Sequence, residues 1–290
     1  PQWLVDEGVD SILDLFQTVD PFERPRLLTM VEVLNGGLPA LAALDVKTSA
    51  GSQFKHLVSH NAPGKRSIIG AEKPYKIVSP EFQKRLEDNE RMLRCGVQPD
   101  FLADYVLKAE MRSKKRVLVE KGEIPSSRGI NVSPLDETML MRKYFGHFIN
   151  FMHSNYSRFE MCVGINVFSK DWNAMILDML RVSPVGLAMD YSGHETNSTS
   201  QMFEAFGKVV EAYYERGFSC AEDRMMRKRL LYCVCYHRTR VGSDVFMKNE
   251  HLMSGSAITA IMNSFVTMLH FRIAFLVLGR GTREGASLSD

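Results

Sequence analysis

The stretch AMDYSGHETN carries two carboxylates, Asp190 and Glu195, five positions apart across a turn. Asp190 ends a short apolar run, VSPVGLAMD (residues 182–190), which is typical of a buried strand with the carboxylate at its tip. Oxygen ligands held at such a strand end suit a hard divalent cation such as Mg²⁺. In the alternative interpretation Asp190 only begins a turn and Glu195 is solvated, and so short a pattern does not decide between the two.

A second pair of polar groups lies on an apolar segment, SGSAITAIMN. Thr259 and Asn263 are four residues apart and share one helical face. They follow Ser254 and Gly255, and this glycine is free to take a positive φ. A hydroxyl and an amide in such surroundings need hydrogen-bonding partners. They either bond internally in a capped core helix or face a bound molecule.

Basic residues are concentrated between residues 104 and 128, where two short strands are predicted at 106–111 and 115–120. Lysine and arginine side chains that alternate on paired strands can converge on one triphosphate. The simpler interpretation is a solvated charged face, because acidic residues partly offset the basic ones.

The turn KTSAGSQF contains Thr48, Ser49 and Gly51. Its small residues would let a nucleic-acid strand approach the backbone closely. Taken alone, the pattern indicates only a loop.

The composition is that of a soluble globular protein, with 290 residues, 45% hydrophobic and 24% charged, enough for one large domain or two ordinary ones. The net charge of +2 gives no argument for nucleic-acid binding, which must come from local patches. Five cysteines, an odd number, fit reduced thiols. Cys233, Cys235 and His237 alternate but lack the second pair typical of a zinc site, so buried thiols along a strand are expected.

The N-terminus is acidic, which argues against a secretory signal. Residues 258–279 are long and apolar enough to span a bilayer. This segment contains Asn263, His270 and Arg272, which are costly in lipid, so a buried core helix and no transmembrane segment are predicted. The chain begins with Pro1 and stops after GASLSD, and both ends are expected to be cuts in a longer protein.

Hydrophobic spacing and capping signals predict the remaining elements. The segment 45–70 is expected to be mostly loop, and the second basic region, CAEDRMMRKRLL, is expected to lead into a strand. Ser198 to Gln201 resembles a capping box. Helices are predicted within 1–45, at 79–96, at 136–156, after residue 201 and in the last apolar segment.

Taken in order, these motifs resemble a viral RNA-dependent RNA polymerase of the picorna-like kind. The order is a TSxG turn, a K-x-E-x-x-R segment, a D-x-x-x-x-acid strand end and S-G-x-x-x-T-x-x-x-N. NVSPLDETMLMRKYFGHF and CVGINVFSKDW also resemble connecting segments in dicistrovirus and iflavirus polymerases. The resemblance extends from about Leu27 onward and stops before motif C of that family.

The resemblance implies an α+β right-hand polymerase fold. The fingers would be rich in helices, part of an antiparallel palm sheet would be present, and the thumb and the motif C hairpin would be missing. The implied domains are fingers over 1–180, palm with motif A over 181–203, a fingers insertion over 204–245 and a truncated palm with motif B over 246–290.

The same resemblance implies a role for each candidate residue. Asp190 matches the catalytic, metal-binding carboxylate of motif A. Thr48, Ser49 and Gly51 match the template-binding motif G. Asn263 would read the ribose 2′-hydroxyl. The implied nucleotide-binding residues are Lys108, Arg112, Arg116 and Arg128 of motif F, Glu195 of motif A, and Ser254, Gly255, Thr259 and Asn263 of motif B.

The implied activity is viral RNA genome replication by two-metal nucleotidyl transfer, with two Mg²⁺ (or Mn²⁺) ions as cofactors. The implied partners are an RNA template and primer, nucleoside triphosphates, and the remaining palm and thumb of a parent polyprotein. The expected location is the host cytoplasm, at viral replication complexes.

Three features depart from the family pattern. Ala109 stands where an aspartate is usual, Glu195 is one methylene longer than the usual aspartate and follows an unusual His194, and no Gly-Asp-Asp occurs. The chain by itself is therefore expected to be inactive. Two other hypotheses are a non-catalytic RNA-binding remnant of an endogenised viral polymerase gene, and a helical interaction module whose motif matches are accidental.

Overall fold

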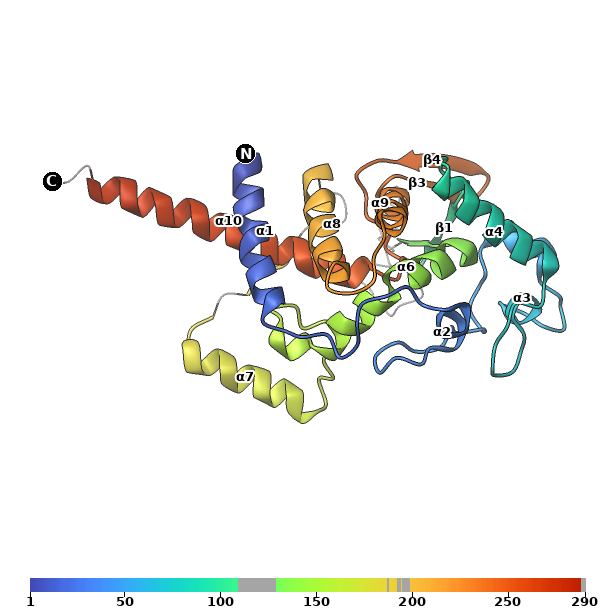
Figure 1. Cartoon of the computed structure of the whole chain (residues 1–290), viewed down its shortest axis with the longest axis horizontal. Helices are drawn as coiled ribbons and strands as arrows, with labels where there is room; N and C mark the ends of the chain where they lie inside the picture. Colours follow the sequence, from blue (N-terminus) through green and yellow to red (C-terminus); the bar gives the residue numbers. More distant parts are fainter. Residues whose placement is uncertain (109–128, 187, 192–193, 195–198, 288–290) are drawn as a thin grey trace, which may run out of the picture.

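The computed structural model describes residues 1–108, 129–186, 188–191, 194 and 199–287. Figure 1 shows a helix-rich molecule with one small sheet at one end and a long helix, α10, reaching away from it. The core is continuous from the first helix to the first half of α10.

Helix α6 (Leu135–Ser154) is the centre of the fold and is buried on nearly all sides. It contacts α2 (Met30–Asn35), α4 (Pro80–Arg94), α8 (Ser200–Tyr214) and α9 (Ala221–Cys235). Helix burial on all sides needs apolar residues all round, and α6 supplies them.

A second helical layer forms where α1 (Gln2–Gln17) packs against both α8 and α10 (Thr259–Ser287). Val9, Ile12 and Phe16 form the buried face of α1, at the spacing of an amphipathic helix. The Phe16 ring stacks on Phe159, with 4.6 Å between centroids. This layer fixes α10 and therefore the polar residues that α10 carries.

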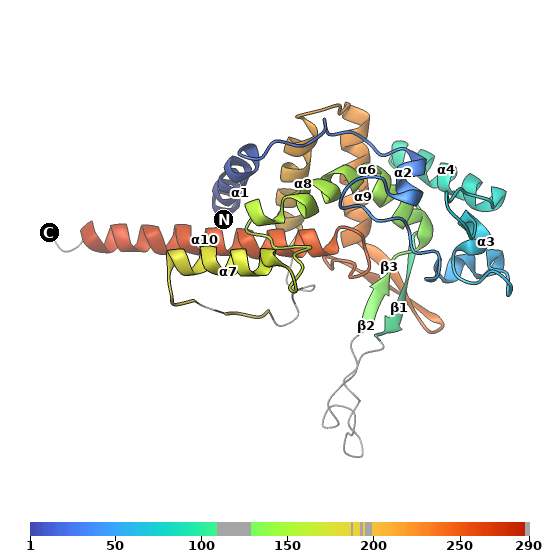
Figure 2. The same ribbon diagram turned by 90° about the horizontal axis from the view of Figure 1, so that it is seen from below.

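The sheet has the strand order β2-β1-β3-β4, with β1 at Leu102–Leu107, β2 at Gly129–Val132, β3 at His237–Val241 and β4 at Asp244–Lys248. The β1–β2 and β3–β4 pairs are antiparallel, and the β1–β3 pair is parallel. The sheet is therefore mixed. Figure 2 shows β1 and β2 projecting together from the helices.

Short elements complete the chain. The 45–70 segment is mostly loop, as predicted, and contains the 3₁₀ helix η1 (Ser52–Leu57) and the single turn α3 (Arg66–Ile69). A second 3₁₀ turn, η2 (Tyr156–Arg158), follows α6. Helix α7 (Lys170–Val182) has no buried residue.

Two predicted helices are confirmed almost to the residue. Helix α4 begins after Ser79, whose hydroxyl accepts a hydrogen bond from the Phe82 N–H at 3.3 Å, and α6 coincides with the predicted helix at 136–156. The predicted capping box is wrong: α8 has Thr199 as its N-cap residue, without a side-chain cap, and Ser198 lies outside the described residues.

The strand predicted at 182–190 is wrong. Residues 183–186 and 188–190 have no regular structure and are exposed, and none of the four described strands pairs with them. An apolar run becomes a strand only when a neighbour takes up its backbone hydrogen bonds. No such neighbour lies beside this segment in the part of the chain that the structure describes.

The strand predicted around the cysteines is also wrong. Cys233 and Cys235 are buried, as expected, but they belong to α9, and β3 begins only at His237. Arg227, earlier in the same helix, ties α9 to α8, because its guanidinium is fully buried and donates two hydrogen bonds to Glu211 of α8. That pair fixes the register of α9 against α8 through the apolar residues that follow.

Candidate functional site

The loop before α10 is held by the hydroxyl of Thr259. This hydroxyl donates to the carbonyl oxygens of Met253, at 2.6 Å, and Ser256, at 3.0 Å. Leu252, Met253 and Ile258 are completely buried on either side. The proton of Thr259 is therefore used within the protein, as in the internally capped alternative, and only the lone pairs of its oxygen remain for a ligand.

Ser254 and Gly255 hold the same loop against strand β2. The N–H of Asn131 donates to Oγ of Ser254 at 2.9 Å. A Cβ on Gly255 would lie 2.4 Å from the carbonyl oxygen of Asn131. The freedom of Gly255 to take a positive φ is not used, because its φ lies outside the left-handed region. The glycine is needed for close approach to β2 instead.

Asn263 lies one turn into α10 and offers an unused hydrogen-bonding atom. Its side-chain Oδ1 is shielded from solvent and has no hydrogen-bond partner among the described residues. A sheltered amide oxygen without a donor costs stability. Oγ of Ser256 and Oδ1 of Asn131 are also without a partner among the described residues, and of these three groups only Asn263 lines the cavity described next.

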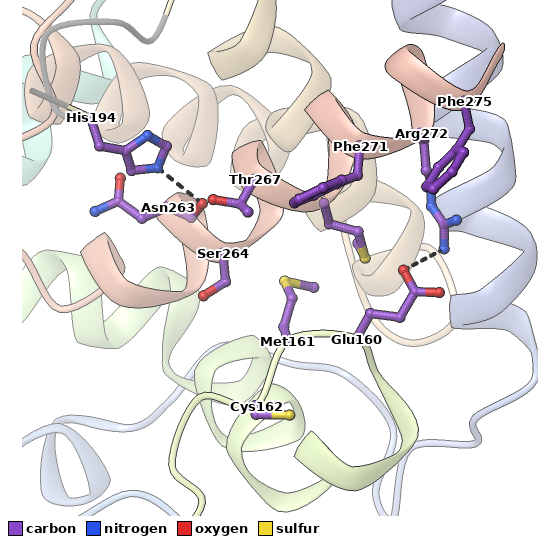
Figure 3. Close-up of a pocket in the computed structure, with 11 residues that line it drawn as sticks. Glu160, Met161, Cys162, His194, Asn263, Ser264, Thr267, Phe271, Arg272 and Phe275 are labelled. Atoms are coloured by element: carbon purple, nitrogen blue, oxygen red, sulfur yellow. Dashed lines mark hydrogen bonds and ion pairs between the residues drawn. The ribbon is translucent and has the colours of Figure 1, made fainter. Parts of the chain in front are cut away.

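A cavity of about 540 Å³ opens beside Asn263. Figure 3 shows it between α10 and the segment that follows η2, with Ser264 and Thr267 on the helix side and Cys162 opposite. Arg272 and Glu160 close one end with an ion pair of 3.0 Å. The cavity thus has a polar end near Asn263, and Met161, Met268, Phe271 and Phe275 supply apolar walls.

Asp190 is exposed and is not among the residues that line the cavity. Two described residues that follow it contact α10: Nε2 of His194 lies 3.2 Å from the backbone oxygen of Asn263, and the Tyr191 hydroxyl lies 3.5 Å from Nδ1 of His270. The structure therefore brings His194, four residues after Asp190, to Asn263. A direct pairing of the Asp190 and Asn263 side chains stays a prediction.

The basic segment begins where the sheet ends. Lys108 is exposed and directly follows β1, whose last residue, Leu107, pairs with Gly129 of β2. The first predicted strand, 106–111, overlaps β1 at two residues. The second predicted strand and the residues Arg112, Arg116, Arg128 and Glu195 lie outside the described residues.

The turn that contains Thr48, Ser49 and Gly51 is firmly held. The Thr48 hydroxyl accepts from the ammonium group of Lys65 and donates to the Asp45 carbonyl at 2.9 Å. The Ser49 hydroxyl accepts from the Gly51 N–H at 3.1 Å, and Gly51 has a φ of 103°. Burial is the main cause that lowers the pKa of Lys65.

A second cavity, of about 490 Å³, lies against this turn. Ser49 and Gly51 line it together with Lys47, Lys55 and His60. Cationic side chains beside exposed backbone suit a phosphate-bearing strand. Lys47, Lys55 and Lys65 were missed from the sequence, where only the small residues of the turn were noticed.

Sequence reasoning also missed a buried polar cluster at the start of α6. The Asp136 carboxylate accepts hydrogen bonds from Gln53, Arg85 and Asn89. The neighbouring Glu137 is fully buried, and neither of its carboxyl oxygens has a hydrogen-bond partner among the described residues. Burial raises the pKa of Glu137 well above its usual value. Two acids in a first helical turn ordinarily indicate only a solvated helix end.

A metal site at the alternating cysteines has no support in the geometry. Burial raises the pKa of the Cys233 and Cys235 thiols, which disfavours the thiolate that a metal needs, and it lowers the pKa of His237 to about 4. No group of three His, Cys, Asp or Glu that could hold a metal ion occurs within the described ranges.

Helix α10 has one stretch, Thr259–Gly279, that is long and apolar enough to cross a membrane. Ile261, Met262, Phe265, Val266 and Leu269 of its first half are buried in the core. Phe275, Val277 and Leu278 of its second half are exposed. The absence of a transmembrane segment stays a prediction.

Known proteins of similar sequence include viral polyproteins, and those of similar structure include a viral polymerase. The chain is 26% identical over 283 residues to the genome polyprotein of rice tungro spherical virus (strain Vt6), an overlap of 94% of this chain and 8% of the polyprotein. It is 25% identical over 256 residues to the replicase polyprotein of acute bee paralysis virus (strain Rothamsted), 87% of this chain and 13% of that one.

The solved structure of the Sicinivirus 3Dpol RNA-dependent RNA polymerase matches with a TM-score of 0.71 and 20% identity, over 93% of this chain and 53% of that chain. The fold is thus that of part of a viral polymerase, as predicted. The family model for viral RNA-dependent RNA polymerase matches residues 12–288. This chain belongs to the viral RNA-dependent RNA polymerase family.

Proposed function

We propose that this chain supplies the nucleotide-binding half of a polymerase that copies RNA from an RNA template. The observation that carries the proposal is the sheltered, unpartnered Oδ1 of Asn263 at a cavity of about 540 Å³, with the segment that follows Asp190 hydrogen-bonded to the same residue. An amide oxygen in that state is suited to accept a hydrogen bond from a hydroxyl group. Membership of the polymerase family makes a ribose hydroxyl the matching group.

In this proposal, different residues of the chain bind the metal ions, the triphosphate and the template. Asp190 is an exposed carboxylate, a hard oxygen donor, and fits Mg²⁺ or Mn²⁺, which protein sites commonly hold through one or two carboxylates together with substrate phosphates. Such ions, when bound, stabilise the attacking and leaving oxygens of nucleotidyl transfer. Lys108 and the basic residues after it would neutralise the triphosphate. The Thr48–Gly51 turn, beside its lysine-lined cavity, would guide the template.

The chain covers 53% of the solved polymerase that it matches. We infer that it is inactive alone and works with the rest of a palm and a thumb, on an RNA template, a primer and nucleoside triphosphates. We place that work in the host cytoplasm, at viral replication complexes. The described cysteines are all unpaired, which suits a reducing compartment. The division into fingers and palm segments stays part of this proposal.

The test is Asp190→Ala in the full-length polymerase that contains this chain. Primer extension on an RNA template should fall by about a thousandfold or more, because charge stabilisation at the reacting phosphate is lost. RNA affinity, measured by filter binding, should stay unchanged. The matched control is Asp178→Ala, since Asp178 is an exposed aspartate of α7 that pairs only locally with Arg181, at 2.7 Å.

Normal extension by Asp190→Ala would overturn the metal-binding role of this carboxylate. Equal loss in the Asp178→Ala control would mean that the effect is general rather than catalytic. RNA binding without extension by the unaltered full-length protein would favour the non-catalytic RNA-binding remnant over the polymerase.

A further inference from the structure

We propose that His194 is a positioning residue that fastens the segment after Asp190 to α10 at Asn263. This inference rests on the proposed function and deepens it, because the hydrogen bond sets where the Asp190 carboxylate lies relative to the sheltered amide. In the sequence, His194 stands out only as an unusual residue next to Glu195. Its position in the structure gives it a specific task.

The first contact is a hydrogen bond to the backbone. Nε2 of His194 lies 3.2 Å from the carbonyl oxygen of Asn263 (Figure 3). A carbonyl oxygen only accepts, so Nε2 carries the proton and donates. Both the neutral ring with its hydrogen on Nε2 and the charged ring can do this, and the tie therefore needs no ionisation.

The second contact is aromatic. The His194 ring lies against the Tyr191 ring, with 4.7 Å between centroids and 35° between planes. Tyr191 in turn lies against His270 of α10, 6.0 Å between ring centroids. Asn263 and His270 are two helical turns apart, which corresponds to about 10 Å along α10. Two attachment points at that spacing fix the direction of the segment as well as its distance from the helix.

The surroundings favour a neutral His270. Burial lowers the pKa of His270, and the charge of a protonated His194 lowers it further. The charged groups that face the same cavity, Arg272 and Glu160, form an ion pair of 3.0 Å. Tyr191, a neutral His270 and the His194 ring therefore form a ring-packed bracket between the two halves of the site.

The bracket explains how an exposed carboxylate can still be placed. Residues 183–186 and 188–190 are exposed and lack regular structure. Tyr191 and His194 are the first residues after Asp190 with contacts to α10 that the structure shows. A substitution of His194 that keeps a flat ring but removes the N–H donor should leave the fold intact. It should shift only the segment that contains Asp190 and Tyr191.

The experiment compares His194→Phe, which keeps a ring but loses the donor, with His194→Gln, which keeps an N–H donor, in the full-length polymerase. His194→Phe should lower kcat/KM for ribonucleotides by about fivefold to tenfold, the worth of one hydrogen bond. It should also narrow the preference for ribonucleotides over deoxyribonucleotides. His194→Gln should restore most of both, with an unchanged melting temperature throughout. The control is His56→Gln, at an exposed histidine paired with Glu81.

Unchanged kinetics and ribose preference in His194→Phe would overturn the inference. Equal losses in the Phe and Gln variants, with lowered melting temperatures, would also overturn it, because they would show a merely structural role. Hydrogen–deuterium exchange of the peptide that contains Tyr191, measured on the 290-residue chain, separates this inference from the proposed function. Faster exchange in His194→Phe supports the tie even if the full-length protein incorporates no nucleotide, and unchanged exchange contradicts the tie whatever the activity.

Discussion

The loop at residues 251–258, which leads into α10, and the exposed residues 183–186 and 188–190, which lead to the α10 contact of Tyr191, are held in opposite ways. The loop is bound through its backbone: the N–H of His251 donates to Cys235 and the N–H of Met253 donates to Val234. The segment carries exposed apolar side chains such as Val185, which is 80% exposed. The amide half of the candidate site is thus preformed by its own fold, whereas the carboxylate half depends on a few side-chain contacts.

The largest test of this contrast is Gly255→Ala. The added Cβ would meet the Asn131 carbonyl at 2.4 Å and force the loop away from β2, so the free energy of unfolding should fall by about 2–3 kcal/mol. Urea denaturation measures this. The matched control is Gly186→Ala in the exposed segment, where a Cβ would have no neighbour within 4 Å.

Gly186→Ala should change the free energy of unfolding by less than about 0.5 kcal/mol. Similar losses at both glycines would abolish the distinction between the two regions. A harmless Gly255→Ala would show that the loop does not depend on its close contact with β2.

A smaller effect is expected for Thr259→Val, which keeps the side-chain shape and removes the hydroxyl that caps the loop. The cost should be about 1 kcal/mol, the usual worth of such a hydrogen bond. Thr267→Val, on the same face two turns later, is the control, because Thr267 lines the cavity and leaves the loop untouched. Equal melting temperatures of the two variants in thermal unfolding would contradict the capping role of Thr259.

The last test concerns the layer beneath the loop, where Ser133 contacts Met253 and Glu137 is fully buried. Burial raises the pKa of Glu137 in the folded chain above its unfolded value, so the stability that it contributes is present below about pH 4 and is lost as pH rises through the folded pKa. Glu137→Gln removes this titration.

The difference in unfolding free energy between the wild type and Glu137→Gln should therefore change with pH, by at most about 1.4 kcal/mol per pH unit. Denaturant titrations at a series of pH values measure it. A pH-independent difference in unfolding free energy would mean that the Glu137 carboxyl is solvated or paired. Water would then reach the layer beneath the loop.

Patterns with local causes were predictable from the sequence. Helix α4 follows from Ser79 and the amphipathic spacing of Phe82, Leu86 and Leu93, and these residues act within a few positions of one another. The polymerase motifs also gave the correct family and fold. Residue types at fixed spacing were enough for that.

Features with distant causes were not predictable. The apolar run before Asp190 has strand composition, but pairing depends on a neighbour from elsewhere in the chain. Leu230 to Cys235 suit a buried strand or a helix equally well, and in the structure they belong to α9, which packs against α4, α6 and α8. Glycine is needed at 255 because the Asn131 carbonyl lies where a Cβ would be. The positioning role of His194 depends on its hydrogen bond to the Asn263 carbonyl.

The packing of α1 against α8 and α10 has a consequence for how the molecule is made. A ribosome completes α1 first, yet the surfaces that cover Val9 and Ile12 belong to helices near the other end of the chain. The parallel pairing of β1 with β3 likewise waits for residues made more than a hundred positions later. Contacts between residues so distant along the chain slow folding and leave apolar surfaces exposed during translation. Nascent chains of this fold should therefore be clients of chaperones until α10 has left the ribosome.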